Sequence, residues 1–501
     1  WPLVPGGGEP GEENLAAAVG EVAARVSGPD LLRACTGKTI HIPIRALLLL
    51  AKKFPDVLNS IITQGHELDK YVLQAWMDHK KETNVTKLIS EFLVLLISNE
   101  QNLTPAVANH FLAHMGESVG TYQISSTTEN LLVLEESLMI LKLFLKAMAA
   151  QDNTTTIVDN VKNIFIELMK VLSAADEASL LQAGTQGATA FVQQIATQDN
   201  ENSGGFDENS ALFFQQLTEH VKRVLEPEMD DSLGMFAPDL ALHLLLLHTN
   251  QEATGSLLAA LLNKLAFAQS EALSGQLVLA LVRLVAVDAE AVTSFLLTSS
   301  LPPPLNGNGM ELFLAQWLRF HSETKSTYLA KVSCAGMLSL LSCCIHNLAL
   351  CSTSVRADLM LRGPARGNEA TRTGAPPRHR WLARLENRTL VAAVALCLAR
   401  AVASGGNEVE DEDEEEGEAS GPVLFYRATT EEFLFEDKNA ESDPMGAIDL
   451  KGAMESLFLC SVKEEESVEV STTALENLLT CSGMGAIEQQ EIRNTVLASL
   501  E

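Results

Sequence analysis

Histidine and cysteine side chains that are able to bind a metal ion lie close together at two places in the sequence. His110 and His114 are one helical turn apart, a spacing that can chelate zinc, but Phe111 stands where a metalloprotease motif has its glutamate. The second group lies in and just after the Leu-rich stretch 338–350, which we predict to be an apolar helix, whereas zinc ligands usually come from converging turns. We therefore interpret both groups as helix and core side chains, and we predict no metal site and no cofactor. The second group consists of Cys343, Cys344, His346 and Cys351.

Motifs for nucleotide binding and catalysis are incomplete or missing from the sequence. Gly37-Lys38-Thr39 matches the end of a phosphate-binding P-loop, but Leu32 replaces the first glycine that such a loop needs. The sequence contains no nucleophile elbow, no dinucleotide fingerprint after a predicted strand and no kinase signature set. Carboxylates are plentiful, yet none is set apart by its spacing as an acid–base pair. We therefore predict that the chain is not an enzyme.

A dense acidic run is the one motif with a clear binding chemistry. Nine of the eleven residues from Glu408 to Glu418 are acidic, and their mutual repulsion favours an extended, disordered loop. Such a polyanion can bind Lys- and Arg-rich proteins and steer them by long-range attraction. The alternative is a solvated loop with no binding role, which is what charge runs usually are. The candidate cargo-binding residues are Glu408, Glu410, Asp411, Glu412, Asp413, Glu414, Glu415, Glu416 and Glu418.

Helical periodicity runs through most of the chain before this loop. Leucines in 129–150 recur at alternating spacings of three and four residues, and apolar residues in 157–172 do the same, so each stretch predicts one buried helix face. The short turn Asp152-Asn153-Thr154 predicts that these two helices form an antiparallel hairpin. Further hairpins are predicted for 180–197 with 209–226, 234–248 with 254–267, 271–286 with 289–299, and 310–320 with 325–351.

A hairpin period of about 40–50 residues is typical of HEAT and armadillo repeats. We therefore predict an all-α fold, a HEAT-repeat superhelical solenoid of antiparallel helix pairs, with an ordinary large helical domain as the alternative. Composition divides the chain into six segments. They are a flexible or truncated N-terminal segment (1–28), the solenoid (29–352), an Arg-rich insert loop (353–388), a helix (389–403), a disordered acidic loop (404–443) and C-terminal HEAT-type helices (444–501).

The formal net charge of −30 predicts repulsion from nucleic acid and anionic membranes and attraction to basic proteins, although acidity that only aids solubility is an equal alternative. Most of the eight cysteines lie in apolar helical stretches, which indicates reduced thiols and a cytosolic or nuclear protein. No apolar run approaches the length of about 18–20 residues that spans a bilayer. The first residues, from Trp1 to Pro5, are not typical of a signal peptide.

The order of motifs in 290–501 resembles the C-terminal portion of importin-beta-type nuclear transport receptors (karyopherins), and most of all the importin nine branch. The segments Met310–Trp317 and Tyr328–Ser333 resemble a helix pair of that branch. Thr371-Arg372-Thr373 with Trp381 resembles its basic segment, which the acidic run then follows. The final matches are an Asp-Pro-x-x-x-Ile-Asp-Leu element at 443–450 and a closing helix at 488–500.

This resemblance implies the C-terminal half of a nuclear import receptor, an armadillo-type fold that shuttles between cytoplasm and nucleus. Such a receptor binds basic cargo such as core histones or ribosomal proteins, contacts Phe-Gly nucleoporins at the pore, and releases its cargo when Ran-GTP binds. The N-terminal repeats that hold most of the family's contacts to the small GTPase Ran are not recognisable here. The resemblance also implies that the acidic loop contacts cargo, and we expect a monomer with no nucleic-acid or membrane partner. The alternative function is a non-shuttling acidic histone chaperone or a helical-repeat scaffold.

Overall fold

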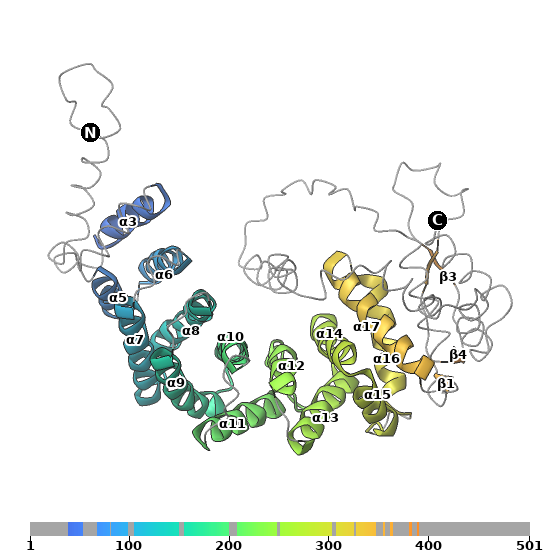
Figure 1. The fold of residues 1–501 in the computed structure, drawn as a ribbon. Helices are drawn as coiled ribbons and strands as arrows, with labels where there is room; N and C mark the ends of the chain where they lie inside the picture. Colours follow the sequence, from blue (N-terminus) through green and yellow to red (C-terminus); the bar gives the residue numbers. More distant parts are fainter. Residues whose placement is uncertain are drawn as a thin grey trace, which may run out of the picture. The chain divides into compact units, whose positions relative to one another are not determined.

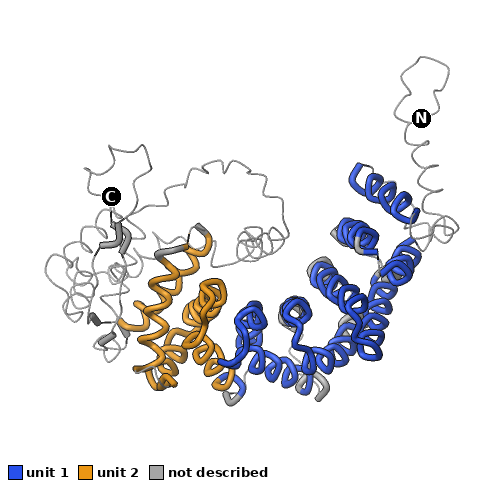
Figure 2. The backbone as a smooth tube through the Cα atoms, turned by 180° about the vertical axis from the view of Figure 1, so that it is seen from behind, with its two compact units in different colours: residues 1–254 blue, residues 255–501 orange. Residues whose placement is uncertain are grey.

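The computed structural model describes helices and short strands across much of residues 39–389 (Figure 1). The described residues are 39–53, 68–80, 82–98, 105–149, 155–199, 208–247, 251–302, 307–324, 327–346, 354–355, 361–363, 380–382 and 388–389. The chain divides into two compact units, residues 1–254 and residues 255–501 (Figure 2).

The described residues of unit 1 form helices that pack in two rows. The inner row consists of α3 (His41–Lys53), α6 (Thr83–Ser98), α8 (Thr128–Ala149), α10 (Ala178–Asp199) and α12 (Ala237–Leu247), each packed against the next. The outer row consists of α5 (Leu68–Asp78), α7 (Pro105–Ile124), α9 (Thr155–Ala174) and α11 (Glu208–Val224). Within unit 1 the inner row lies on the inside of a bend (Figure 1). The predicted all-α helical-repeat solenoid is confirmed.

Helix α8 shows how the sequence produces one of these elements. The Thr127 hydroxyl accepts a hydrogen bond from the backbone N–H of Asn130 at 3.3 Å, which caps the first turn. Four leucines of the predicted stripe are buried, namely Leu134, Leu138, Leu141 and Leu145, whereas Leu131 is only half-buried. The spacing of three and four residues therefore places one continuous apolar face toward the neighbouring helices.

The pairing of helices differs from the prediction. Helix α8 makes its main contacts with α6, α7 and α10, not with the sequence neighbour α9, and α10 packs mainly on α8, α9 and α12 rather than on α11. The predicted hairpins 129–150 with 157–172 and 180–197 with 209–226 are therefore wrong as packing units. Periodicity specifies which face of a helix is buried, but several apolar neighbours are able to cover that face, and the two-row stack decides among them.

Unit 2 continues the helical pattern among its described residues. Its helices are α14 (Glu271–Val287), α15 (Ala289–Thr298), α16 (Gly309–Glu323) and α17 (Thr327–His346), and α13 (Gln251–Phe267) crosses the unit boundary. Helix α14 packs against α15, which confirms the predicted pair 271–286 with 289–299, and also against α16 and α17. Helices α14, α15 and α16 each begin with an N-cap. The side chains of Ser270, Asp288 and Asn308, respectively, accept a hydrogen bond from a first-turn backbone N–H.

Short strands lie within the Arg-rich insert. Strand β1 (Ser354–Val355) pairs antiparallel with β4 (Arg388–Thr389), and β2 (Leu361–Gly363) pairs antiparallel with β3 (Arg380–Leu382). Thr389, where the sequence predicted a helix to begin, therefore lies in a strand, because the chain returns antiparallel on itself at this point. The rest of 389–403 lies outside the described residues, as do 404–443, 444–501 and the N-terminal segment 1–28.

Gly336 allows α17 to lie close to two other helices. A Cβ atom at this position would lie 2.7 Å from Val282 Cγ1 on α14, 3.2 Å from the Val282 carbonyl oxygen and 3.1 Å from the Trp317 ring on α16. Gly255 on α13 is different, since a Cβ atom there would have no neighbour within 4 Å. The two glycines therefore form a matched pair for substitution.

We expect Gly336→Ala to lower the free energy of unfolding by about 1–3 kcal/mol, because overpacking outweighs the gain in helix propensity. Gly255→Ala should raise it by about 0.5–1 kcal/mol, since only the propensity changes. Thermal unfolding followed by circular dichroism measures both effects. Equal stability of the two variants would contradict the close packing of α17.

Candidate functional site

The predicted cargo-binding residues, Glu408 to Glu418, lie outside the described residues. The 371–373 segment and the 443–450 element lie outside them as well. The predicted helix pair at 310–320 and 325–351 is described, since it corresponds to α16 and to α17, which ends at His346. These two helices are joined by a hydrogen bond of 2.8 Å that Trp317 Nε1 donates to Ser333 Oγ.

The two histidines with zinc-like spacing have separate partners. His110 Nδ1 lies 2.6 Å from a carboxylate oxygen of Asp69, whereas the His114 ring stacks on Trp76 with 4.9 Å between ring centroids. Burial lowers the pKa of His114 to about 4, so its imidazole is neutral near pH 7. Among the residues that the structure describes, no group of three or more His, Cys, Asp or Glu side chains is placed to hold a metal ion.

The cysteines of α17 are free thiols in or near the core. Cys334 and Cys344 are buried, and burial raises the pKa of the Cys334 thiol to about 12, which makes it inert. Cys343 is half-buried. The interpretation as core thiols is therefore confirmed for Cys344, while the side chains of His346 and Cys351 lie outside the described residues.

Three carboxylates gather where α8 meets the start of α10, and we call them the Glu135 cluster. They are Glu135 and Glu136 on α8 and Glu177, which directly precedes α10. Glu135 accepts a hydrogen bond from Ser179, and Glu136 accepts one of 3.0 Å from Ser90 on α6. The inner row thus brings together acidic residues from two successive repeats.

The carboxylates of the Glu135 cluster carry like charges and repel one another. The pKa of Glu135 is raised, first by burial and then by the negative charge of Glu177, although the Ser179 hydroxyl opposes the shift. The pKa of Tyr122, near the end of α7, is raised by burial and then by Glu177 and Glu135. Clustered acids with raised pKa values mark a place where an added positive charge is stabilised, and they occur often at functional sites.

Glu136 is the most restrained member of the cluster. Burial and, to a lesser degree, Glu135 raise its pKa, while Ser90, Trp76 and Lys87 favour its ionised form. The neutral indole N–H of Trp76 lies near enough to favour the ionised form of Glu136, but no hydrogen bond of normal geometry joins the two groups. The Glu136 carboxylate therefore interacts mainly with side chains of this chain. Glu135 and the exposed Glu177 are the members of the cluster best placed to bind a partner protein.

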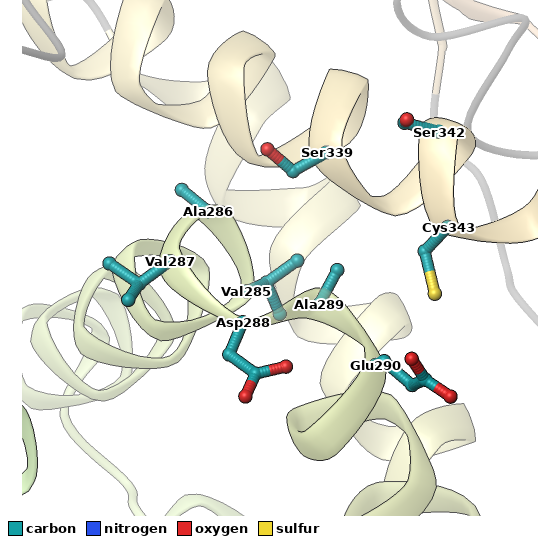
Figure 3. Close-up of a pocket in the computed structure, with 9 residues that line it drawn as sticks. All are labelled: Val285, Ala286, Val287, Asp288, Ala289, Glu290, Ser339, Ser342 and Cys343. Atoms are coloured by element: carbon teal, nitrogen blue, oxygen red, sulfur yellow. The ribbon is translucent and has the colours of Figure 1, made fainter.

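Unit 2 contains a second acidic surface, an open pocket of about 480 Å³ (Figure 3). Val285, Ala286 and Val287 supply apolar walls, and Ser339, Ser342 and Cys343 face them from α17. Asp288 and Glu290 supply the charge, although the Asp288 carboxylate also caps α15 by accepting a hydrogen bond of 3.0 Å from Ala291 N–H. The pKa of the Cys343 thiol is raised by burial, then by Glu290 and Asp288, so this cysteine is a poor nucleophile.

Sequence reasoning did not find the Glu135 cluster. Glu135-Glu136 is an ordinary acidic pair in a helix, and Glu177 lies some forty residues further along the chain. Only the packing of α8 on α10 brings them together. The sequence gives only a weak indication of this cluster, namely acidic residues on or next to helices that are otherwise mostly apolar.

Comparisons with known proteins assign neither a family nor a function to the chain. No protein-family model matches the chain, and no curated protein sequence matches it. Among solved structures, it is similar to a circular tandem repeat protein with novel repeat topology and enhanced subunit contact surfaces, with 12% identity over 98% of this chain and 91% of that chain. The TM-score is 0.20, so this likeness carries no argument. No described helix is long and apolar enough to cross a membrane.

Proposed function

We propose that the chain is the segment of a nuclear import receptor that binds basic protein cargo, such as core histones, and carries it through the nuclear pore with Ran-GTP-dependent release. The observation that carries the proposal is the Glu135 cluster, where carboxylates from two repeats lie together and where burial, with the negative charge of a neighbouring carboxylate, raises the pKa of Glu135 and of Glu136. A Lys or Arg side chain of a cargo protein would relieve that repulsion. The repeat architecture supports the proposal, because stacked helical repeats offer long surfaces for protein partners.

The roles of the partners follow from the resemblance in 290–501. Histones or ribosomal proteins would contact the acidic residues of the repeats and the acidic loop 408–418. Phe-Gly nucleoporins would contact apolar sites between helices during passage between cytoplasm and nucleus. Ran-GTP would act through N-terminal repeats of the family type.

We expect the variant Glu135→Gln/Glu136→Gln/Glu177→Gln to bind a core-histone dimer about fivefold more weakly, because ion pairs of the cargo with Glu135 and Glu177 each contribute about 0.5 kcal/mol. The matched control neutralises three acids on or next to the outer row, of which two already pair with a lysine in the chain. The control is Glu167→Gln/Glu219→Gln/Glu226→Gln, and it should bind as the parent does. Isothermal titration at low and at moderate NaCl concentration measures both variants, and the parent affinity should fall with salt.

Two outcomes would contradict the proposal. An equal loss in the control would show that net charge alone attracts the histones, and no binding at low salt would remove the cargo role. The alternative function, a non-shuttling acidic chaperone, predicts the same histone affinity. Binding to immobilised Phe-Gly repeats separates the two, since a transport receptor is retained and a chaperone is not.

A further inference from the structure

The pocket of unit 2 lies where α14 ends and α15 begins, and α17 forms its opposite wall (Figure 3). Part of its lining is apolar, since Val285, Ala286, Val287 and Ala289 contribute to it. Val287 is 68% exposed, so its methyl groups are accessible to a ligand. The volume of about 480 Å³ falls within the range of about 300–1,000 Å³ that is typical of ligand pockets.

Two carboxylates give this pocket a negative charge. Asp288 and Glu290 both line it, and no described Lys or Arg side chain forms an ion pair with either of them. The pKa of the Cys343 thiol is raised by burial, then by Glu290 and Asp288, so the negative potential of both carboxylates reaches across the pocket to α17. Because Asp288 also caps α15, Glu290 is the carboxylate that is more free to bind a ligand.

The end of α14 adds further hydrogen-bond acceptors. The last four carbonyl groups of an α-helix have no partner within the helix, and the Leu284 carbonyl accepts a hydrogen bond of 2.8 Å from Asp288 N–H. The other three carbonyls belong to residues 285–287, all of which line the pocket. The C-terminus of a helix carries a partial negative charge, which favours a cation. The N-terminus of α15 has the opposite sign, but the Asp288 carboxylate compensates for it.

The wall that α17 forms is polar. Ser339 and Ser342 line the pocket from this helix, and neither hydroxyl forms a hydrogen bond with another described residue. Hydroxyls on other helices of the chain bind the carbonyl four residues earlier, as those of Ser137 and Thr185 do. The Ser339 and Ser342 hydroxyls are therefore available to accept hydrogen bonds from a ligand.

We propose that this pocket binds the side chain of an arginine in a protein partner, with the guanidinium at Glu290 and the methylene stem along Val287. A guanidinium has five N–H donors in a planar fork, which suits a carboxylate surrounded by hydroxyl and carbonyl acceptors, whereas an ammonium has three donors and is more strongly hydrated. The stem of an arginine packs along apolar surface while its charge stays in contact with water. Basic cargo would supply such an arginine, so the identity of the partner rests on the proposed function.

The test is a methyl NMR titration of the full chain, with the Val287 methyl groups as reporters and acetyl-Gly-Arg-Gly-amide as the probe. At low NaCl concentration we expect a saturable change in the Val287 signals. The peptide with norleucine in place of arginine should cause none at the same concentrations, because it has an apolar stem without the charge. Free L-arginine should bind more weakly than the peptide, since its own carboxylate is repelled by Asp288 and Glu290.

Two substitutions form a matched pair, because Glu290 and Glu271 are first-turn glutamates of α15 and α14. Glu271 lies at the opposite end of the 17-residue helix α14, about 24 Å from the pocket. Glu290→Gln should weaken binding of the arginine peptide about threefold, whereas Glu271→Gln should leave it unchanged. Asp288→Asn keeps a good N-cap residue for α15 and should weaken binding about twofold.

Four outcomes would overturn the proposal. They are the absence of a saturable change at Val287, equal binding of the norleucine peptide, an equal loss in Glu271→Gln and Glu290→Gln, and tighter binding of free L-arginine than of the peptide. The last of these would indicate a site for a small molecule rather than for a protein. Failure of this site leaves histone binding by the Glu135 cluster intact, whereas failure of the proposed function appears as no histone binding at low salt.

Discussion

Lowering the pH from 7 to 4 is expected to destabilise both units, and unit 1 more than unit 2, because buried histidines must remain neutral in the folded chain. His114 and His220 lie in unit 1 and His321 lies in unit 2. Burial lowers the pKa of each to about 4 from an ordinary value of 6.5, and Arg223 adds to the effect at His220. Between these two pH values the unfolded chain binds more protons than the folded chain, so stability falls as the pH falls.

The hydrogen bonds around these histidines explain why the charged form is disfavoured. The hydroxyls of Ser137 and Thr185 donate to backbone carbonyls of their own helices, so they accept from His114 and His220 in turn. Protonation would add a second N–H to each ring, and His220 Nδ1 has no hydrogen-bond acceptor in the described structure. Because the pKa of each buried histidine lies at about 4 rather than at 6.5, protonating either one in the folded chain costs about 3 kcal/mol more than in the unfolded chain.

We expect urea unfolding at pH 7, 6, 5 and 4 to show a steady loss of stability, and His114→Gln/His220→Gln to remove most of that loss in unit 1. Glutamine keeps an N–H donor but does not take up a proton. The control His41→Gln, at the half-exposed start of α3, should keep the pH dependence of the parent. The raised pKa values of Glu135 and Glu136 act in the opposite direction, since these groups are easier to protonate when folded. An unchanged pH profile in the double variant would contradict the burial of these histidines.

Phe165→Ala is expected to lower the stability of unit 1 by about 3–5 kcal/mol, because it leaves a cavity at a junction of both rows. Phe165 on α9 stacks on Phe191 of α10 with 5.1 Å between ring centroids and meets Phe213 of α11 edge-on at 6.3 Å. All three rings are buried. Such aromatic contacts add about 0.5–1.5 kcal/mol beyond the burial of surface.

The loss of stability caused by Phe165→Ala should be confined to the helices that contact Phe165. Hydrogen exchange should accelerate in α9, α10 and α11, whereas α14 and α17 of unit 2 should keep the rates of the parent. Phe165→Leu is the matched control, and we expect a cost of about 1 kcal/mol because most of the volume is retained. A cost below that of Phe165→Leu, or equal loss of protection in unit 2, would show that the three rings do not join the rows.

The sequence by itself determined the helical character of the chain and the buried face of many helices. Alternating spacings of three and four residues identify Leu134, Leu138 and Leu141 as core residues, because a helix turns once in about 3.6 residues. The sequence also supported the interpretation of Cys344 as a core thiol. These properties depend on residues that lie close together in the chain, so the periodicity and chemistry of a short stretch are sufficient to predict them.

The tertiary structure alone decided which helices pack together and which distant side chains meet. Helix α8 lies against α6, α7 and α10 because the stack offers several apolar neighbours, and periodicity does not rank them. The same packing brings Glu177 to Glu135, and it gives His114 the partners Trp76 and Ser137 while His110 pairs with Asp69. Such contacts join residues far apart in the sequence, so their geometry and pKa shifts arise only once the rows have formed.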